Sequence, residues 1–395
     1  MKILVLNCGS SSIKYKLYNM DDKSVIAAGG IEKVGLEDSF LKTKSPVAEV
    51  ITTPVPTHDV GVELIFKTLT DPQKGCIKSL DEINAVGHRI AHGGKFTKSL
   101  LLTPEVLAEW KTYESLAPLH NPAHLKGIEA VTAKLPEVKQ VGVFDTSFHQ
   151  TMPDYAYTYA LPYEYYEKYG IRRYGFHGTS HRYVLARAAE LFGFDPKDKN
   201  VISCHIGNGA SIAAIKQGRC VDTTMGLTPL EGLVMGTRTG DIDPSAILFL
   251  MDQLGLNTQQ ASDLLNKKSG MLGITSKYSD MREILAAAAA GDARCQLALN
   301  IYNYRIRKYV CAYAGIMGGV DYIIFTAGVG ENQYEIRMGS MEGLQHLGIT
   351  IDPEANRANR SMEGVISTPD SKVTVCVIPT DEELLVASDT MDIVK

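Results

Sequence analysis

The sequence predicts an α/β protein with a duplicated fold. Three segments share one design, in which an apolar strand runs into a short turn of Gly, Asn and Ser: residues 3–17, 201–215 and 322–332. In the first two segments a second strand follows the turn. Turns of this composition expose backbone N–H groups, and those groups bind phosphate oxygens. Because the first two segments lie far apart in the chain yet in equivalent contexts, we expect two similar halves that clamp a nucleotide between them.

The composition is that of a globular protein and excludes several classes of function. The 395 residues suffice for two domains of ordinary size. A net charge of −5 argues against a general nucleic-acid binder but permits a local basic cleft for a small anion. The opening apolar run stops at Asn7, too early for a signal peptide, and no run reaches the ~18 residues of a membrane helix. We therefore expect a cytoplasmic protein without a nucleic-acid or membrane partner.

The cysteines favour a reducing compartment. The chain has seven of them, an odd number, and no Cys-x-x-Cys pair, so free buried thiols are the preferred interpretation. Cys8 and Cys204 lie beside the glycine turns, where a small residue fits, and a catalytic thiol there is the less favoured alternative.

Strands and helices alternate in the first part of the chain, as in α/β folds. A hairpin over residues 2–18 has alternating apolar positions, and the Pro- and Thr-rich residues 45–60 predict an edge strand and a loop. The elements expected next are a helix near 60–70, a strand at 83–87, helices near 104–116 and 122–134, and a strand at 140–144. We expect the domain change near 148–152.

The second part begins with a Tyr-rich stretch and a loop at 175–180, after which we expect a helix over 181–192 and a hairpin from 201. Asp280 as N-cap, with Glu283 three positions on, predicts a helix start, and residues 292–317 predict another helix. A strand at 373–378 precedes a terminal helix from about 381. A helix this short must dock, so the predicted domains are 1–148 joined by helix 382–395, and 149–381.

The glycine turns are candidate phosphate-binding loops. Ser10 and Ser12 lie in the first turn, and Lys14 on the following strand could reach a phosphate as a point charge. Tight hairpins are the structural alternative for one such turn, but three turns favour phosphate binding. The Walker spacing G-x-x-x-x-G-K-[ST] is absent.

Three histidine pairs have the i, i+4 spacing of a helical zinc site: His88/His92, His120/His124 and His177/His181. None of the pairs carries the Glu of H-E-x-x-H. Pro122 interrupts the second pair, Gly178 weakens a helix through the third, and all three pairs are expected in loop-like contexts. A zinc hydrolase therefore ranks last among the candidate functions.

Two arginines beside glycines are candidates for binding anions. Arg89 lies in Gly-His-Arg, and Arg238 lies in Thr-Arg-Thr-Gly-Asp, where Asp241 and Asp243 could orient its guanidinium. Planar guanidinium forks match carboxylate or phosphate bidentately. The alternative for each is an ordinary surface salt bridge.

Two acids also stand out. Asp145 ends an apolar strand, the place where sheet enzymes usually carry functional groups. Glu382 opens the last helix, where the helix dipole favours an acid in any case. Either acid could serve Mg²⁺, which is bound by one or two carboxylates plus substrate phosphates.

Eight motifs, in order from residue 1 to about 390, resemble the acetate kinase (acetokinase) family. They are Asn-Cys-Gly-Ser-Ser-Ser-Ile-Lys from residue 7, Gly-His-Arg-Ile-Ala-His-Gly-Gly from 87, Ala-Pro-Leu-His-Asn-Pro from 117, Phe-Asp-Thr-Ser-Phe-His from 144, Arg-Arg-Tyr-Gly-Phe-His-Gly-Thr-Ser-His from 172, His-Ile-Gly-Asn-Gly-Ala-Ser from 205, Gly-Val-Gly-Glu-Asn from 328 and Pro-Thr-Asp-Glu-Glu-Leu from 379.

The resemblance implies two duplicated actin-like (ribonuclease H-like) ATPase domains with a nucleotide cleft between them, the fold shared by sugar kinases, actin and heat-shock chaperone ATPases. It implies a homodimer formed by the C-terminal domain. The implied reaction is reversible transfer of a phosphoryl group from ATP to acetate, giving acetyl phosphate and ADP. The implied cofactor is Mg²⁺, for which Mn²⁺ can substitute.

Carried over by position, the resemblance implies that Asn7 and Glu382 serve the metal. Asp145 matches the family's catalytic acid, and His177 and Arg238 match the residues that stabilise the transferring phosphoryl group. The implied substrate-binding residues are Arg89 for the carboxylate, together with Ala91, Leu119, His120, Phe176 and Pro229 around the acyl group. The implied ATP contacts are Ser10, Ser12, Lys14, His205, Ile206, Gly207, Asn208, Gly209, Asp280, Met281, Arg282, Gly328, Val329, Gly330, Glu331 and Asn332.

One pocket position departs from the family pattern. The residue matched by Ala91 is often Val, and Ala removes two methyl groups, so propionate should be accepted somewhat better. An added methylene is worth about 1–3 kcal/mol in such pockets, so discrimination will be modest. A propionate or butyrate kinase of the same fold stays the nearest alternative, followed by a non-enzymatic actin-like ATPase module.

The substrate itself argues against a general base. A carboxylic acid with a pKa near that of Glu, about 4.3, is already ionised at pH 7 and is a nucleophile without help. We therefore expect Asp145 to orient Mg²⁺, its waters or a nearby Arg rather than to remove a proton.

Overall fold

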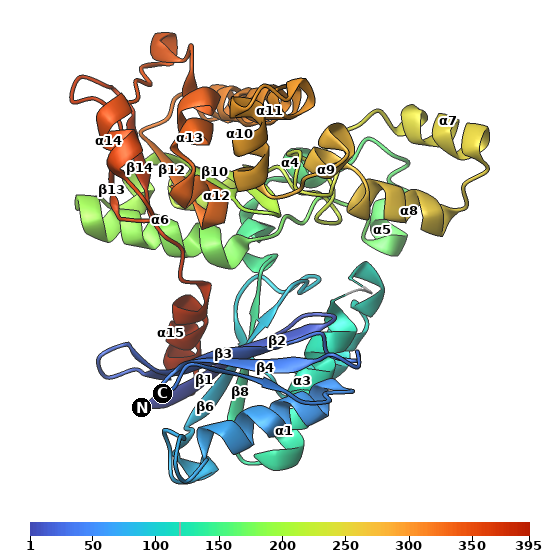
Figure 1. Ribbon diagram of the computed structural model, residues 1–395, viewed down its shortest axis with the longest axis vertical. Helices are drawn as coiled ribbons and strands as arrows, with labels where there is room; N and C mark the ends of the chain where they lie inside the picture. Colours follow the sequence, from blue (N-terminus) through green and yellow to red (C-terminus); the bar gives the residue numbers. More distant parts are fainter. Residues whose placement is uncertain (118–119) are drawn as a thin grey trace. The chain divides into compact units, whose positions relative to one another are not determined.

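The computed structural model describes residues 1–117 and 120–395, which divide into two compact units (Figure 1). Unit 1 comprises Met1–Gln150 and Asp381–Lys395, and unit 2 comprises Thr151–Thr380. No helix in the described part of the chain is both long enough and apolar enough to cross a membrane.

Unit 1 is built on an eight-stranded mixed sheet with the order β5-β4-β3-β2-β1-β6-β8-β7. Its strands are β1 (Lys2–Cys8), β2 (Ser12–Asn19), β3 (Ser24–Glu32), β4 (Phe40–Ser45), β5 (Glu49–Thr52), β6 (Ala85–Ile90), β7 (Leu100–Leu101) and β8 (Lys139–Phe144). Its helices are α1 (His58–Leu69), α2 (Pro104–Lys111), α3 (Asn121–Lys134) and α15 (Glu382–Val394). As predicted, the Pro- and Thr-rich segment supplies the edge strand, β5.

Strand alternation gives the first sheet two different faces. One face, including Leu4, Leu6 and Ile13, packs against apolar side chains of α1 and α3. The other face, including Ile3 and Val5, packs against Val386 and Ala387 of α15. The last helix of the chain therefore belongs to the core of unit 1, as its red ribbon beside the blue strands shows in Figure 1.

Unit 2 is built on a six-stranded sheet with the order β11-β10-β9-β12-β14-β13. Its strands are β9 (Asn200–Ile206), β10 (Ala210–Lys216), β11 (Arg219–Thr223), β12 (Tyr322–Thr326), β13 (Gly364–Val365) and β14 (Thr374–Val377). Its helices are α4 (Asp154–Tyr157), α5 (Glu164–Tyr169), α6 (Gly178–Phe192), α7 (Pro244–Leu254), α8 (Thr258–Lys267), α9 (Gly270–Thr275), α10 (Met281–Ala289), α11 (Ala293–Met317), α12 (Ala327–Asn332), α13 (Tyr334–Met341) and α14 (Pro353–Ala358).

The two sheets share one topology, which confirms the predicted duplication. In the first, β3-β2-β1 pair in antiparallel fashion, and β6 and β8 then continue from β1 in parallel. In the second, β11-β10-β9 are antiparallel, and β12 and β14 continue from β9 in parallel. A glycine turn joins β1 to β2 in the first unit and β9 to β10 in the second, as the sequence indicates.

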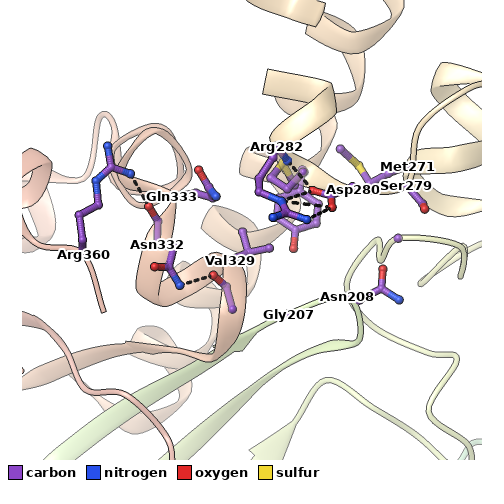
Figure 2. A pocket seen from close by; sticks show the side chains of 14 residues that line it. Gly207, Asn208, Met271, Ser279, Asp280, Arg282, Val329, Asn332, Gln333 and Arg360 are labelled. Carbon is purple, nitrogen blue, oxygen red and sulfur yellow. Dashed lines mark hydrogen bonds and ion pairs between the residues drawn. The ribbon is translucent and has the colours of Figure 1, made fainter. Parts of the chain in front are cut away.

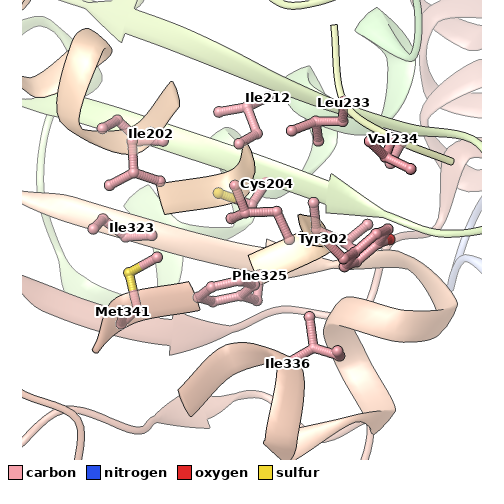
Figure 3. Packing of buried hydrophobic residues seen from close by; sticks show 14 of the residues in the cluster. Ile202, Cys204, Ile212, Leu233, Val234, Tyr302, Ile323, Phe325, Ile336 and Met341 are labelled. Carbon is pink, nitrogen blue, oxygen red and sulfur yellow. The ribbon is translucent and has the colours of Figure 1, made fainter. Parts of the chain in front are cut away.

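The core of unit 2 lies on one face of its sheet (Figure 3). Alternate residues such as Ile202, Cys204 and Phe325 are fully buried there and pack with residues of α11 and α13, including Tyr302 and Ile336. Helix α6 packs on the opposite face. The face of the sheet that contacts α6 becomes polar near the start of this helix, where Ser203 and Ser211 lie.

The predicted N-cap at Asp280 is confirmed. The Asp280 side chain caps α10 by accepting from the backbone N–H of Arg282. The helix predicted over 292–317 is α11, which Asp292 caps in the same way and which Gly318 ends in the left-handed region with φ 77°.

Four details differ from prediction. The third glycine segment forms the short helix α12 after β12 rather than a turn, with Ala327 at φ 64°. The helix predicted over 181–192 already begins at Gly178, and the helix predicted over 104–116 ends at Lys111 before a separate 3₁₀ turn. The predicted strand 83–87 extends to Ile90, because its Gly-His-Arg segment pairs with both β1 and β8.

Close packing of α15 on β6 gives a first prediction. A Cβ on Gly87 would lie 2.4 Å from Thr390 Oγ1 and 2.7 Å from Val386 Cγ1. Gly87→Ala should therefore lower the free energy of unfolding by about 1–3 kcal/mol, as overpacking does, measured by urea denaturation. Gly315→Ala in α11 is the control, since nothing lies within 4 Å of its Cβ position. It should be neutral or stabilising, and an equal loss in both variants would contradict the packing argument.

Candidate functional site

Strand geometry gathers polar side chains at one end of the first sheet. Asn7 pairs directly with Lys14 across β1 and β2, so both point to the same face. Arg89 pairs with Val143 of β8, and Asp145 lies two residues further along. The apolar face that receives α15 thus continues into charged and amide groups where the parallel strands end.

Arg89 is the centre of this cluster. Its Nη2 lies 2.6 Å from Asp145 Oδ2, and its Nε lies 3.2 Å from Asp145 Oδ1 and 3.1 Å from Glu382 Oε2. Among residues 1–117 and 120–395, no hydrogen bond or ion pair uses Arg89 Nη1. The guanidinium is therefore held in one orientation while one of its donor groups remains available.

The start of α15 is fixed by a second set of charges. Lys16 Nζ lies 3.1 Å from Asp381 and 3.3 Å from Glu383, and Tyr18 donates to Asp381 at 3.2 Å. Asp381 also caps the helix through the Leu384 N–H. These contacts place Glu382 at the Arg89 cluster.

The electrostatics of the cluster favour an additional cation. Burial raises the pKa of Glu382 to about 7, and the Asp145 carboxylate adds to this effect, although Arg89 opposes it. When Glu382 is ionised, two carboxylates share the one guanidinium of Arg89. Carboxylate oxygens, and an amide oxygen such as that of Asn7, are the ligand types that a divalent cation prefers. Within the described residues, no group of three or more His, Cys, Asp and Glu side chains is arranged to hold a metal.

The first glycine turn lies on the same hairpin. The Gly9 N–H donates to Ser12 O at 2.8 Å, which closes the turn, and His58 Nε2 lies 2.7 Å from Gly9 O. Ser10 and Lys14 are exposed, and Ser12 is half-buried. The turn is thus rigid while its side chains remain accessible.

The remaining acyl-pocket candidates of unit 1 are Ala91, which follows Arg89 by two residues, and Leu119 and His120. The Ala91 N–H donates to His124 Nε2 at 3.2 Å. His120 stands at the N-cap of α3, and Leu119 lies outside the described residues. Burial and the nearby Arg89 lower the pKa of His124, which keeps its ring neutral.

Unit 2 contains a cavity of about 890 Å³ at the second and third glycine segments. Its volume lies within the range of small-molecule sites, ~300–1,000 Å³. Eight of the predicted ATP contacts line it: Gly207, Asn208, Asp280, Met281, Arg282, Gly328, Val329 and Asn332. Figure 2 shows these residues converging from β9, α10 and α12.

Two polar pairs shape the walls of the cavity (Figure 2). Arg282 folds back on the helix-capping Asp280, with Nη2 2.6 Å from Oδ2. Arg360 donates to Asn332 O at 2.6 Å, and Asn332 donates to Gly328 O at 3.0 Å. The sides of the cavity therefore carry guanidinium groups, which suit an anionic ligand.

Other predicted ATP contacts support the cavity from behind. Glu331 is buried, and its carboxylate accepts from Ser361 Oγ at 2.8 Å and Thr380 N–H at 3.2 Å. Ile206 belongs to the hydrophobic core of unit 2, and Gly330 is buried within α12. These three residues hold the cavity segments in place and do not line the space.

Arg238 and His177 meet at the second glycine turn. A Cβ on Gly209 would lie 3.4 Å from Arg238 Nη1 and 3.6 Å from His177 Nε2. His177 has φ 57°, which is unusual for a non-glycine residue and accompanies functional sites. Its ring stacks on His205 with centroids 4.1 Å apart.

The predicted orientation of Arg238 by Asp241 and Asp243 is wrong. Asp241 instead accepts from Tyr309 at 2.6 Å and from Gly232 N–H at 2.9 Å, while Asp243 caps α7. In the described ranges, 1–117 and 120–395, no carboxylate pairs with Arg238; its Nη1 donates to Pro229 O at 3.1 Å. Burial lowers the pKa of Arg238, yet an arginine stays charged. A partly desolvated cation without a counter-ion is an anion-binding group.

The prediction that all three histidine pairs lie in loops is wrong, since His88 lies in β6, His124 in α3 and His181 in α6. Pro122 lies in the first turn of α3, where its missing N–H costs nothing, and His181 lies within α6. His88 contacts Gln140 at 2.8 Å, and His181 contacts Ser203 at 2.8 Å. Burial lowers the pKa of His88 to about 4.

The sequence analysis missed six residues that line the cavity: Gly236, Met271, Ser279, Tyr302, Gln333 and Arg360. Ser279 and Gln333 are sequence neighbours of the predicted contacts Asp280 and Asn332, so extending those two motifs by one residue would have included them. A Cβ on Gly236 would lie 1.9 Å from Asn208 Oδ1, so this glycine allows the second turn to pass. Tyr302 and Arg360 carry no local signal, because tertiary packing alone brings them to the cavity.

Comparison with known proteins gives consistent results. The model of the Acetokinase family matches residues 2–388. An acetate kinase of Bacteroides thetaiotaomicron is 63% identical, over 100% of both chains. The crystal structure of a Porphyromonas gingivalis acetate kinase has 55% identity and a TM-score of 0.97, over 100% of both chains. A propionate kinase structure from Francisella tularensis has 42% identity and a TM-score of 0.93, over 99% of each chain.

The raised pKa of Glu382 predicts a pH-dependent stability. Folded Glu382 retains its proton between about 4.5 and about 7, whereas the unfolded chain releases it, so the free energy of unfolding should fall as pH rises through this window. Urea denaturation of metal-free protein at several pH values should show this fall relative to Glu382→Gln, which cannot titrate. Parallel curves for the two proteins would contradict the proposed charge state.

Proposed function

Because this chain belongs to the acetokinase family, we propose that it is an acetate kinase, which transfers the γ-phosphoryl group of ATP reversibly to acetate. The products are acetyl phosphate and ADP. The observation that carries the proposal is the guanidinium of Arg238, which pairs with no carboxylate among the described residues and lies beside His177 at the Gly207–Gly209 turn, next to a cavity of nucleotide size.

The cavity of unit 2 is the proposed nucleotide site. The glycine-rich backbone at Gly207–Gly209 supplies N–H groups for phosphates, and Arg282 and Arg360 add positive charge. Asp280–Arg282 and Gly328–Asn332 hold the adenosine end. Lys14, Ser10 and Ser12 are the proposed phosphate contacts of unit 1.

Phosphoryl transfer requires positioning and charge stabilisation more than covalent chemistry. Arg238 and His177 are proposed to donate to the oxygens of the transferring group, where negative charge accumulates. Arg238 is suited to this because no protein carboxylate in the described residues competes for it. Donors held ready in this way cost no reorganisation when the transition state forms.

Arg89 is the proposed acetate ligand, through the Nη1 group that the described residues leave unused. Asp145 holds the same guanidinium through two contacts of 2.6 Å and 3.2 Å. Both oxygens of this carboxylate are engaged by the guanidinium, and an ionised substrate needs no proton acceptor. We therefore assign Asp145 an orienting role rather than that of a general base.

Mg²⁺ is the proposed cofactor, with Asn7, Glu382 and Asp145 as the residues that would hold it or its waters. Their oxygen chemistry and excess negative charge fit a hard divalent cation, and Mn²⁺ should substitute. When bound, the ion neutralises charge on the phosphate oxygens.

The partner surface is proposed to be a second copy of this chain. In α7, all of which is described, no side chain is buried, and Leu248, Phe249 and Leu254 are each more than 60% exposed. Apolar exposure of this kind marks an interface. A homodimer through unit 2 would cover it. The seven free cysteines suit a reducing cytoplasm.

A propionate kinase is the second candidate. Ala91 supports it, because a small side chain leaves room for a longer acyl group; the Francisella tularensis relative bears that name. The alternative of a non-enzymatic actin-like ATPase module gains no support. In such a module the buried charges of Arg89 and Asp145 would cost free energy without serving a substrate.

The decisive test is formation of acyl hydroxamate from ATP, Mg²⁺ and hydroxylamine with acetate, propionate or butyrate. We expect acetate to give the highest kcat/KM. The kcat/KM for propionate should be lower by about 10- to 200-fold, which is the usual effect of one methylene group in an apolar pocket. A higher kcat/KM with propionate would favour the second candidate. No hydroxamate from any acid would reject the kinase.

Replacing Arg238 and replacing Arg89 should affect different kinetic constants. Arg238→Ala should lose kcat by about 10³-fold or more, because a phosphoryl-stabilising arginine acts in the transition state. Arg89→Ala should chiefly raise the KM for acetate. Arg187→Ala is the control, since Arg187 pairs with Glu363 and Glu190 on the surface. Steady-state kinetics decide, and an unchanged KM in Arg89→Ala would remove the carboxylate assignment.

A further inference from the structure

A buried polar layer lies between α6 and the second sheet. Helix α6 and its N-cap contribute His177, Ser180 and His181, which lie within one helical turn. Ser203 and His205 alternate along β9, and Ser211 of β10 pairs with His205, so all three share one face of the sheet. The opposite face of the same strands is apolar throughout.

Ser211 joins two histidines of this layer. Its Oγ lies 2.9 Å from His177 Nδ1 and 2.9 Å from His181 Nε2. His181 Nδ1 lies 2.8 Å from Ser203 Oγ. The result is a continuous chain of hydrogen bonds from Ser203 through His181 and Ser211 to His177.

Burying this chain of hydrogen-bonded side chains costs free energy, which argues for a role beyond packing. Ser203, Ser211 and His181 have 0% exposure. Buried hydroxyls and imidazoles cost free energy unless each is hydrogen-bonded, whereas apolar side chains of similar size would pack at no such cost. A fully connected network, in return, fixes the orientation of its members.

The hydrogen-bond chain leads to His177, whose ring faces the Gly207–Gly209 turn. A Ser hydroxyl has one proton, so Ser211 can donate to His177 Nδ1 while accepting from His181 Nε2. In that arrangement the proton of neutral His177 is on Nε2, the atom 3.6 Å from the Cβ position of Gly209 and beside Arg238. The opposite arrangement would leave a bare Nε2 lone pair facing a phosphate oxygen.

We propose that Ser211, supported by His181 and Ser203, is a positioning residue that fixes the ring and tautomer of His177 with its Nε2–H toward the Gly207–Gly209 turn. The inference rests on the proposed kinase function for its kinetic consequence. It assigns a role to three residues that touch neither nucleotide nor acetate. Through them His177 donates to the phosphoryl group without rearranging.

The test removes the hydroxyl and reads both kinetics and tautomer. Ser211→Ala should lower kcat about 10- to 100-fold, the size usual for hydrogen bonds that orient a functional histidine, with the KM values for ATP and acetate little changed. Nitrogen NMR of histidine-labelled protein, assigned with His177→Gln, should show Nε2–H in the wild type and a tautomer mixture in Ser211→Ala. Ser211→Thr retains the hydroxyl and should restore the Nε2–H signal.

The control is Ser367→Ala, which removes another buried hydroxyl of unit 2, one that accepts from Val375 N–H at 3.0 Å. It should leave kcat and the His177 signal unchanged. If Ser211→Ala does not fold, Ser203→Ala at the far end of the chain decides, with a smaller loss in the same direction. An unchanged kcat or an unchanged His177 tautomer in the decisive variant overturns the inference.

The NMR measurement needs no substrate, which separates this inference from the proposed function. A wild-type protein that forms no hydroxamate would reject the kinase while the tautomer test still applied. An active wild type with an indifferent Ser211→Ala would reject only the positioning role.

Discussion

The alternation of side chains along β-strands is the constraint on which both candidate half-sites depend. Helix α15 packs on one face of the sheet of unit 1 and α6 on one face of the sheet of unit 2, and on that face the residues change from apolar to polar toward one end. Asn7 follows Ile3 and Val5 along β1, and His205 follows Val201 and Ser203 along β9. The same helices present functional groups at their N-termini, Glu382 and His177. A register shift of one residue would turn the strand residues Asn7 and His205 to the opposite face of their sheets.

The two units treat their key arginines in opposite ways. Arg89 is held by two carboxylates, and burial, to which the Asp145 charge adds, raises the pKa of Glu382 to about 7, so that a cation would favour the ionised form of this carboxyl group. Arg238 is partly desolvated and has only carbonyl and sulfur contacts in the described structure, which creates a demand for an anion. A phosphate group would suit the Arg238 guanidinium of unit 2, and a divalent cation would suit the carboxylates of unit 1. Geometry and charge thus support the same chemistry as the family membership.

Sequence reasoning succeeded where the signal was local. Asp280 predicted the start of its helix because an N-cap is a short-range hydrogen bond, and the two glycine turns predicted the duplicated hairpins. It failed where a long-range contact decided. The loop expected around Gly178 is the first turn of α6, because the sheet orders it, and Asp241 was drawn to Tyr309 and away from its sequence neighbour Arg238. Proximity in sequence is a weak guide to the partner of a charged side chain.

By itself the sequence determined the α/β class, the duplication, the family resemblance and the residue types available for binding phosphate and carboxylate, because these follow from periodicity and from contiguous motifs. Only the tertiary structure decided that Arg89 is clamped by Asp145 and Glu382 from 56 and 293 residues away along the chain, and that Tyr302 and Arg360 complete the cavity. It also decided that Ser211 lies between two histidines. Such contacts join elements that are distant in sequence, and their energies are settled by burial and by competing partners, which no single segment of the chain encodes.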